Sequence, residues 1–274
     1  MIKTTRAAQI TPAQALHLFS IDRSASLKEL NQAYRRLVVK HHPDRNPGRE
    51  SSAHQAMTQI NAAYDIAVDY LGALRYEEIE NRLDAEIQAH ENFMTVFLNV
   101  ANRVVDGMFT YFQYGLTNPH QRTSGTPRLR YRQALKLMYA AIGRLKAIDA
   151  PNPIDDETSR VFVRFAESFI ECIQIQRVLS PSSPKQERLA YNHYRHGSES
   201  LDNAIRRGFF REELSGPREL ASPQSLSVSL NEFMAVLTRF RDTSWVVETV
   251  VKLQLLDSYT NLLKIAERYE HLGL

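Results

Sequence analysis

The residues best suited to chemistry stand in a row at positions 41–46, where the chain reads His-His-Pro-Asp-Arg-Asn. Residues 27–41 before them have the period of an amphipathic helix, with arginines and a lysine off its apolar stripe. Because a proline pushes the residue before it towards extended geometry, we predict that this helix ends by His41. The imidazole of His42 and the carboxylate of Asp44 would then be exposed in a loop beside a cationic helix face.

Two less specific interpretations apply to the same stretch. The adjacent His41 and His42 could bind a metal, but neighbouring residues on a chain that leaves a helix rarely converge on one ion, and no third ligand follows at a diagnostic spacing. The arginines could belong to a solvated helix face, which is the usual position of a charge run. The proline-broken loop and the capped helices near it favour a binding site over both.

Helix starts precede the stretch. Thr11 and Gln14 have the pattern of a capping box, with a proline at the first helical position, and Ser26 and Glu29 form a second box. After the loop, apolar residues recur at helical spacing as far as Tyr70. Two helices of similar length with facing apolar stripes and a loop between them form an antiparallel hairpin. We therefore predict a small helical unit built around the loop.

This arrangement resembles the J domain of the DnaJ-type co-chaperones, in which a His-Pro-Asp tripeptide follows a basic second helix. The resemblance covers residues 11–70, with the tripeptide at His42, Pro43 and Asp44. It implies an adaptor that docks on a DnaK-type heat shock protein 70 chaperone and accelerates its ATP hydrolysis. We expect no enzymatic activity in the chain itself, and no cofactor or bound metal.

The resemblance also implies which residues contact the chaperone. In the family, the aspartate of the tripeptide pairs with an arginine of the chaperone's ATPase domain, and the basic helix docks on an acidic groove. The implied chaperone-binding residues are His42, Pro43, Asp44, Tyr34, Arg35, Arg36, Lys40, Arg45 and Asn46. Asn31 and Gln32 stand where relatives commonly carry basic residues, so the docking face is less positive than usual.

The formal net charge of +3 lies entirely in the N-terminal part of the chain. Residues 1–72 hold 9 Lys and Arg against 6 Asp and Glu, whereas residues 73–274 hold 25 against 25. The larger part therefore has no excess of positive charge of the kind that nucleic-acid-binding domains carry. The single cysteine excludes an internal disulfide and is consistent with a reducing compartment. Residues 1–10 have no apolar signal core, and no run is long enough to span a bilayer. We expect a soluble, cytoplasmic protein.

Beyond the J-like region the chain departs from better-known family members, because 10 glycines and one cysteine leave no Gly/Phe-rich linker and no zinc repeats. Apolar residues at 76–115 have the spacing of one long helix, which the third helix of the hairpin could join directly through Leu71 and Gly72. About six helices with Pro-, Ser- and Gly-containing loops predict a helical bundle. We predict an all-α protein with a J domain at 1–72 and a C-terminal multi-helix bundle at 73–274.

Three boundaries within the bundle are also predicted. A helix that begins at the acids of 155–157 should continue to Leu179. Ser183 should cap the next helix, which meets Gly197 and resumes beyond it. A last linker is expected at 215–222, before the final two helices.

Other groups in the bundle suggest chemistry but have simpler explanations. The acids at 155–157 could be a carboxylate site, although acids in a first turn favour the helix dipole. Cys172 falls on an apolar stripe and is expected to be an inert core thiol. His193 and His196 have metal-like spacing but no acidic or cysteine partner near them in sequence, so we expect polar surface histidines. Ser182–Lys185 matches a Ser-x-x-Lys pattern, but its proline and loop setting favour a chance match.

The leading hypothesis is therefore a J-domain co-chaperone whose bundle binds a client, a second protein or another copy of the chain. Its layout is similar to that of the J proteins of iron-sulfur cluster assembly, which join a J domain to a helical client-binding bundle. The client, the chaperone and the organism are not readable from the sequence.

Three alternatives stay open. The J-like hairpin could be degenerate, leaving a helical scaffold; burial of Arg35, Arg36 or Asp44 would favour this interpretation, or an autoinhibited form. The chain could be an effector delivered into another cell to exploit its chaperone. The bundle could also be an enzyme, in which a polar pocket would collect His193, His196 and the acids of residues 155–157.

Overall fold

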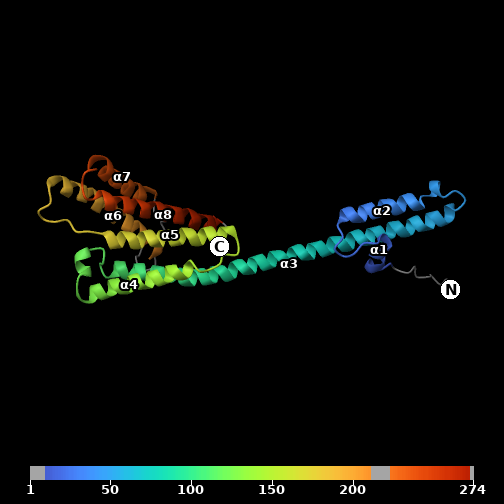
Figure 1. Cartoon of the computed structure of the whole chain (residues 1–274), viewed down its shortest axis with the longest axis horizontal. Coiled ribbons are helices and arrows are strands. Elements are labelled where there is room, and N and C mark those ends of the chain that lie inside the picture. The colour runs from blue at the N-terminus through green and yellow to red at the C-terminus, as the bar shows by residue number, and fades with distance from the viewer. Residues whose placement is uncertain (1–9, 211–222, 272–274) are drawn as a thin grey trace. The chain divides into compact units, whose positions relative to one another are not determined.

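The computed structural model describes residues 10–210 and 223–271, and the chain divides into two compact units at residues 1–87 and 88–274 (Figure 1). The helical elements are α1 Pro12–Phe19, α2 Leu27–His41, η1 Pro43–Arg45, α3 Glu50–Gln113, η2 Pro119–Arg122, α4 Gly125–Leu145, α5 Pro153–Ile175, α6 Lys185–Phe209, α7 Pro223–Arg239 and α8 Val246–His271, where η marks a short 3-10 helix. The described residues contain no strand, so the predicted all-α fold is confirmed. The linker predicted at 215–222 and all but the last of residues 1–10 lie outside the described residues.

Both predicted capping boxes of the N-terminal unit are present. Thr11 Oγ1 accepts a hydrogen bond from the Gln14 amide at 3.3 Å, and Gln14 Oε1 accepts one from the Thr11 amide at 2.9 Å. Ser26 and Glu29 exchange the corresponding bonds at 3.2 and 2.7 Å. The side chains therefore satisfy amide groups that have no partner within α1 and α2, and they fix where each helix begins.

The core of this unit packs α1, α2 and α3 together. Its buried apolar residues are Ala15, Leu16, Phe19, Leu30, Ala33, Ile60, Ala63, Ala67 and Leu71. Two tyrosine–asparagine bonds link α2 to α3 at the margin of the core: Tyr34 Oη donates to Asn61 Oδ1 at 3.0 Å, and Tyr64 Oη donates to Asn31 Oδ1 at 2.5 Å. The two tyrosine rings lie 4.3 Å apart. These contacts set the register of the helical hairpin.

Helix α3 runs from Glu50 to Gln113 without a break at Leu71 or Gly72, so the predicted direct passage into one long helix is confirmed. Its first part belongs to the core of the N-terminal unit, and its last part, from Phe93 onwards, belongs to the core of the second unit. The proposed division at residue 72 stays a prediction.

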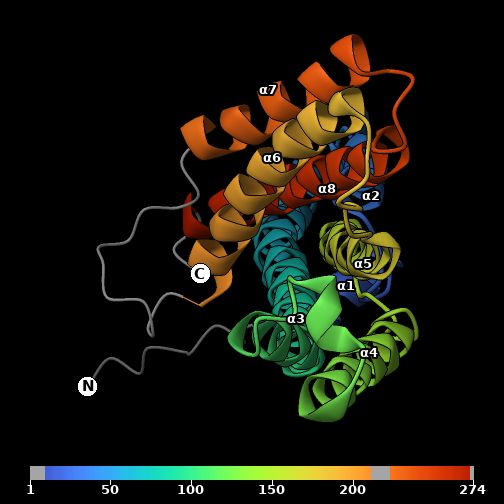
Figure 2. The same ribbon diagram turned by 90° about the vertical axis from the view of Figure 1, so that its left-hand side faces the viewer.

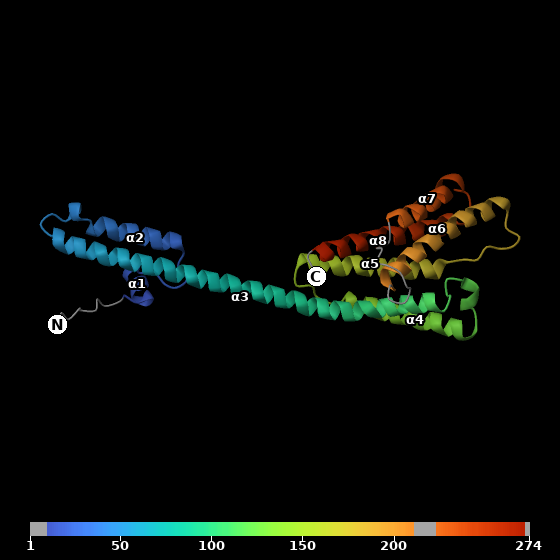
Figure 3. The same ribbon diagram turned by 180° about the vertical axis from the view of Figure 1, so that it is seen from behind.

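The second unit is a bundle in which α6 packs on α7, α5 on α8, and α7 on α8, while α4 packs on α5 (Figure 2). Figure 3 shows α4 alongside the last part of α3. Aromatic side chains fill the centre, and those buried most deeply are Phe165, Phe169, Phe233 and Tyr259. Helix α8 contacts α5, α6 and α7, which explains why its sequence is so rich in aliphatic residues.

Cys172 lies in this core, as predicted. Its thiol donates a hydrogen bond to the backbone oxygen of Val251 at 3.3 Å, and burial raises its pKa to about 12. A thiol with such a pKa stays protonated at neutral pH and is a poor nucleophile.

Three details of the bundle differ from prediction. Helix α5 ends at Ile175, four residues before Leu179, and Pro184 rather than Ser183 precedes α6, with no side-chain cap. Helix α6 passes through Gly197 without interruption. A Cβ at Gly197 would lie 2.7 Å from Cε1 of Phe233, so the glycine allows α6 and α7 to approach closely rather than breaking the helix.

Arg122 fastens η2 to the end of α5. Its guanidinium donates to the backbone oxygens of Leu116 at 2.5 Å and Ile173 at 2.6 Å, and to the side chains of Tyr111 and Gln176. The cation also lies over the Tyr111 ring. Because a fixed guanidinium fork can satisfy several acceptors at once, one residue holds this loop in place.

None of the described helices combines the length and the apolarity needed to cross a membrane.

Candidate functional site

Helix α2 ends at His41, as predicted. His42 follows it with extended backbone angles, φ −63° and ψ 136°, because the proline at 43 disfavours the helical region for the residue before it. The next three residues form the short helix η1, in which the Arg45 amide donates to the His42 backbone oxygen at 3.1 Å. The sequence therefore turns sharply out of α2 and presents residues 42–45 as a compact loop.

Asn46 clamps this loop. Its Nδ2 donates to the backbone oxygens of Lys40 at 3.2 Å and His42 at 2.9 Å. Carbonyl groups at the end of a helix have no partner within it, and here one side chain satisfies two of them. Asn46 was predicted only as part of the binding surface, and the clamp was not predicted. The available signal was an amide-bearing residue five positions after the helix end.

The His42 side chain also supports the turn. Its Nδ1 accepts a hydrogen bond from the Asp44 amide at 3.3 Å, so in this arrangement the ring proton sits on Nε2. Asp44 Oδ2 lies 3.6 Å from the same nitrogen, and no other described residue contacts the Asp44 carboxylate. The Asp44 side chain is 87% exposed. The loop thus presents a carboxylate that is free to accept a bond from an external cation.

Three cations lie on α2 before the loop, and a fourth lies in η1. Arg35, Arg36, Lys40 and Arg45 are exposed, and none of them makes an ion pair with a described residue. Tyr34 differs from them, because its ring packs on Tyr64 within the hairpin and its hydroxyl is bonded to Asn61. The nine predicted site residues thus all lie between Tyr34 on α2 and Asn46 just after η1, but Tyr34 and Asn46 also hold the structure together. The side chain of Pro43 lies outside the part of the chain that the structure describes.

Comparison with known proteins agrees with this geometry. The family model for the DnaJ domain matches residues 17–71. The N-terminal unit contains a J domain. The chain spans about a fifth or less of the length of the curated relatives that it matches.

Three relatives illustrate the match, and each is named chaperone protein DnaJ. The protein of Orientia tsutsugamushi (strain Boryong) is 37% identical over 81 residues, which is 28% of this chain and 21% of the relative. That of Acidiphilium cryptum (strain JF-5) is 48% identical over 52 residues, 19% and 13% of the two chains. That of Wolbachia sp. subsp. Brugia malayi (strain TRS) is 44% identical over 52 residues, 19% and 14%. No solved structure matches the chain significantly.

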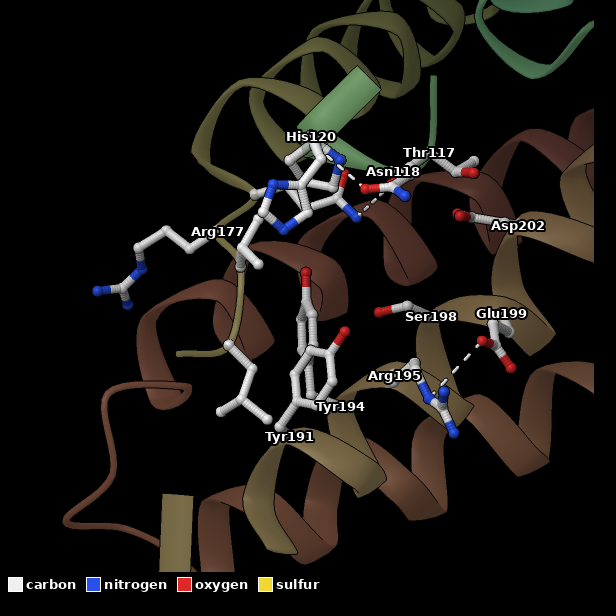
Figure 4. A pocket seen from close by; sticks show the side chains of 14 residues that line it. Thr117, Asn118, His120, Arg177, Tyr191, Tyr194, Arg195, Ser198, Glu199 and Asp202 are labelled. Atoms are coloured by element: carbon white, nitrogen blue, oxygen red, sulfur yellow. Dashed lines mark hydrogen bonds and ion pairs between the residues drawn. The ribbon is translucent and has the colours of Figure 1, made fainter. Parts of the chain in front are cut away.

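Outside the J domain, the bundle has a cavity of about 470 Å³ between η2, the segment after α5, and α6 (Figure 4). Figure 4 shows the hydroxyls of Tyr191 and Tyr194 directed into it and the guanidinium of Arg177 directed away. Its charged side chains already have partners within the bundle. Arg177 pairs with Glu248, Arg195 lies 3.8 Å from Glu199, and Asp202 accepts a bond from Lys252.

Burial raises the pKa of Tyr194 to about 12, so this hydroxyl is neutral at physiological pH. Tyr194 is therefore not poised as a general base or nucleophile at that pH.

The enzyme alternative would bring His193, His196 and the acids of residues 155–157 into one pocket. None of these residues lines this cavity. His193 and His196 each place Nδ1 on one oxygen of Glu232, at 2.6 and 3.0 Å. Asp155 is buried and pairs with Nδ1 of His90 at 2.8 Å. His196 is exposed and His193 partly exposed, and Asp155 and Asp156 stand in the first turn of α5, as predicted. The partners of both histidines and of Asp155 were not predicted, because they come from distant parts of the sequence.

No group of three or more histidines, cysteines or acids in the described part of the chain is arranged to hold a metal.

Proposed function

We propose that this chain is a co-chaperone whose J domain docks on a DnaK-type heat shock protein 70 chaperone and accelerates its ATP hydrolysis. The observation that carries the proposal is the exposed Asp44 carboxylate, held in a clamped loop beside an unpaired cationic helix. Curated relatives named chaperone protein DnaJ match the same segment. We further propose that the protein acts in the cytoplasm and that residues 73–274 bind a client or partner protein.

In the proposed complex, Asp44 accepts a charge-assisted hydrogen bond from an arginine of the chaperone's ATPase domain. Arg35, Arg36, Lys40 and Arg45 face an acidic groove, where they raise the association rate and set the orientation of docking. His42 and Asn46 keep the loop in its binding geometry before the partner arrives. This preorganisation reduces the entropy lost on binding.

The test is single-turnover ATP hydrolysis by a DnaK-type chaperone in the presence of the full chain. We expect acceleration by the wild type and a loss of at least about tenfold in that acceleration with Asp44→Asn, because one charge-assisted bond contributes roughly 1.5–3 kcal/mol. His42→Gln should have a similar effect. Asp69→Asn, which changes an exposed carboxylate of α3 away from the loop, should accelerate hydrolysis as the wild type does.

Failure of the wild type to accelerate hydrolysis, both as the full chain and as residues 1–72, would contradict the proposal. It would favour the alternative of a degenerate J domain on a helical scaffold. Activity with the chaperone of a different organism but not with that of its own would favour an effector delivered into another cell.

A further inference from the structure

Helix α3 exposes an apolar stripe that neither core uses. All residues from 75 to 88 are exposed, although four of them have large apolar side chains. These are Tyr76, Ile79, Leu83 and Ile87, which are 71%, 60%, 54% and 49% exposed. They recur every three or four residues and therefore share one helix face. Contiguous exposed apolar surface of this kind marks an interaction site, and we call it the α3 stripe.

The α3 stripe has acidic margins. Five acids and two arginines stand between residues 75 and 88, and one of the arginines, Arg82, lies 3.8 Å from Glu86 on its own helix. The other acids are Glu77, Glu78, Glu80 and Asp84, and none of them makes an ion pair with a described residue. A partner for this stripe must therefore be both apolar and cationic.

Helix α4 has the opposite character on its outer side. Its inner side is buried by Ala134, Met138, Ala141, Ile142 and Leu145. The rest of the helix carries five cations and no acid; the cations are Arg128, Arg130, Arg132, Lys136 and Arg144, all exposed. Leu129 and Tyr139 lie among them and are 56% and 51% exposed. We call this surface the α4 basic face.

The two surfaces match in charge, in apolar content and in spacing. Arg128, Arg132 and Lys136 follow one another every four residues, which is a rise of about 6 Å along the helix. Glu80 and Asp84 have the same separation on α3. Two helices packed along each other would therefore align these charges while covering the apolar side chains on both.

We propose that the α3 stripe of one copy of this chain docks on the α4 basic face of a second copy. Each chain offers both surfaces, so copies of one chain can supply both sides of the contact. A nucleic acid would satisfy the cations of α4 but would leave the α3 stripe without a partner. The proposal goes beyond the co-chaperone function and does not involve the loop at residues 42–46.

The first measurement is the molar mass of the full chain by sedimentation velocity at increasing concentration. We expect a mass above that of one 31.5 kDa chain as the concentration rises to about 100 μM in dilute salt. The dissociation constant should rise at least about tenfold when salt is increased to 0.5 M, because exposed charges are screened at that ionic strength. A mass of one chain at every concentration in dilute salt overturns the proposal.

Charge reversal separates this contact from any other form of association. Glu80→Lys with Asp84→Lys, and separately Arg132→Glu with Lys136→Glu, should each weaken association at least about tenfold, whereas the chain with all four changes should recover it to within about threefold. Arg132→Lys keeps the charge and serves as the matched control, and circular dichroism of each variant confirms folding. Association that is unchanged by either reversal, or not recovered by the fourfold variant, overturns the proposal.

A separate binding experiment uses a short single-stranded RNA as the probe. RNA binding that is lost in the Arg132→Glu, Lys136→Glu chain, with no self-association of the wild type, would assign the α4 basic face to nucleic acid instead.

Discussion

Asn46 joins the loop that carries Asp44 to the helix before it. Two hydrogen bonds from one amide hold the backbone oxygens of Lys40 and His42, so the position of the Asp44 carboxylate depends on a residue that need not touch the partner. The cation-rich surface alone would attract an acidic groove in many orientations. The clamp, by contrast, presents one geometry.

We predict that Asn46→Ala lowers the free energy of unfolding of the J domain by only about 1 kcal/mol, because the bonds are exposed. The same change should reduce the acceleration of the chaperone's ATP hydrolysis several-fold, because the loop samples more conformations. Asn61→Ala is the matched control, since it removes one exposed side-chain bond between α2 and α3 but leaves the loop intact. Equal acceleration by the two variants would show that the clamp has no part in docking.

A second prediction concerns the buried ion pair between Lys252 and Asp202. Burial alone lowers the pKa of Lys252, but the carboxylate of Asp202, 2.9 Å away, outweighs it and the net direction is upward. Asp202→Asn would leave this ammonium buried without a counter-charge, and we expect a loss of about 3–5 kcal/mol in unfolding free energy. Denaturant titration measures it. Asp202→Asn combined with Lys252→Met should be more stable than Asp202→Asn alone; a less stable double variant would contradict this explanation.

At the scale of helices, Glu232 joins α7 to α6 by accepting bonds from two histidines one turn apart. Burial raises the pKa of this carboxyl, but the hydrogen bonds from His193 and His196 lower it by more. The net pKa therefore lies below the ordinary value of 4.5. A carboxylate with a lowered pKa stabilises the fold above pH 4.5, and that stabilisation is lost as the pH falls through the folded value.

We therefore predict that Glu232→Gln lowers the unfolding free energy by about 1–2 kcal/mol at pH 6. The difference between wild type and variant should shrink as the pH falls from about 5 to 3, because the wild-type carboxylate becomes protonated in that range. Urea titrations at several pH values give the comparison. A difference that does not change with pH would mean that the bond, and not the charge, is what matters.

The helices themselves were readable from the sequence because their signals are local. Thr11 and Ser26 each cap a helix by bonding to a residue three positions further on, and the proline at 43 acts on its neighbour. The start of α1, both ends of α2 and the loop were therefore predicted. The pairings of Glu232 with His193 and of Asp155 with His90 join residues 39 and 65 positions apart. Only tertiary packing brings such groups together, so no spacing in the sequence predicts these pairings. Gly197 was misjudged for the same reason, because Phe233 explains it.

At the scale of the whole molecule, the family model for the DnaJ domain matches about a fifth of the chain, and the curated relatives named above match 52 to 81 of its residues. The bundle is neutral in total, yet its charge is unevenly distributed, with cations gathered on α4. The overall composition does not reveal this uneven distribution of charge. It can be recognised only when the buried side of α4 is known. The two proposals are independent: docking on the chaperone uses the loop after α2, whereas self-association uses α3 and α4.

The most direct test of the co-chaperone proposal is a double-mutant cycle between Asp44→Asn and a Gln substitution of the chaperone arginine that pairs with the family's aspartate. The measured quantity is the single-turnover rate of ATP hydrolysis in the four combinations. If Asp44 and that arginine form the proposed bond, each single change should lower the rate and the double combination should be no slower than either. Two effects that simply add would contradict the pairing.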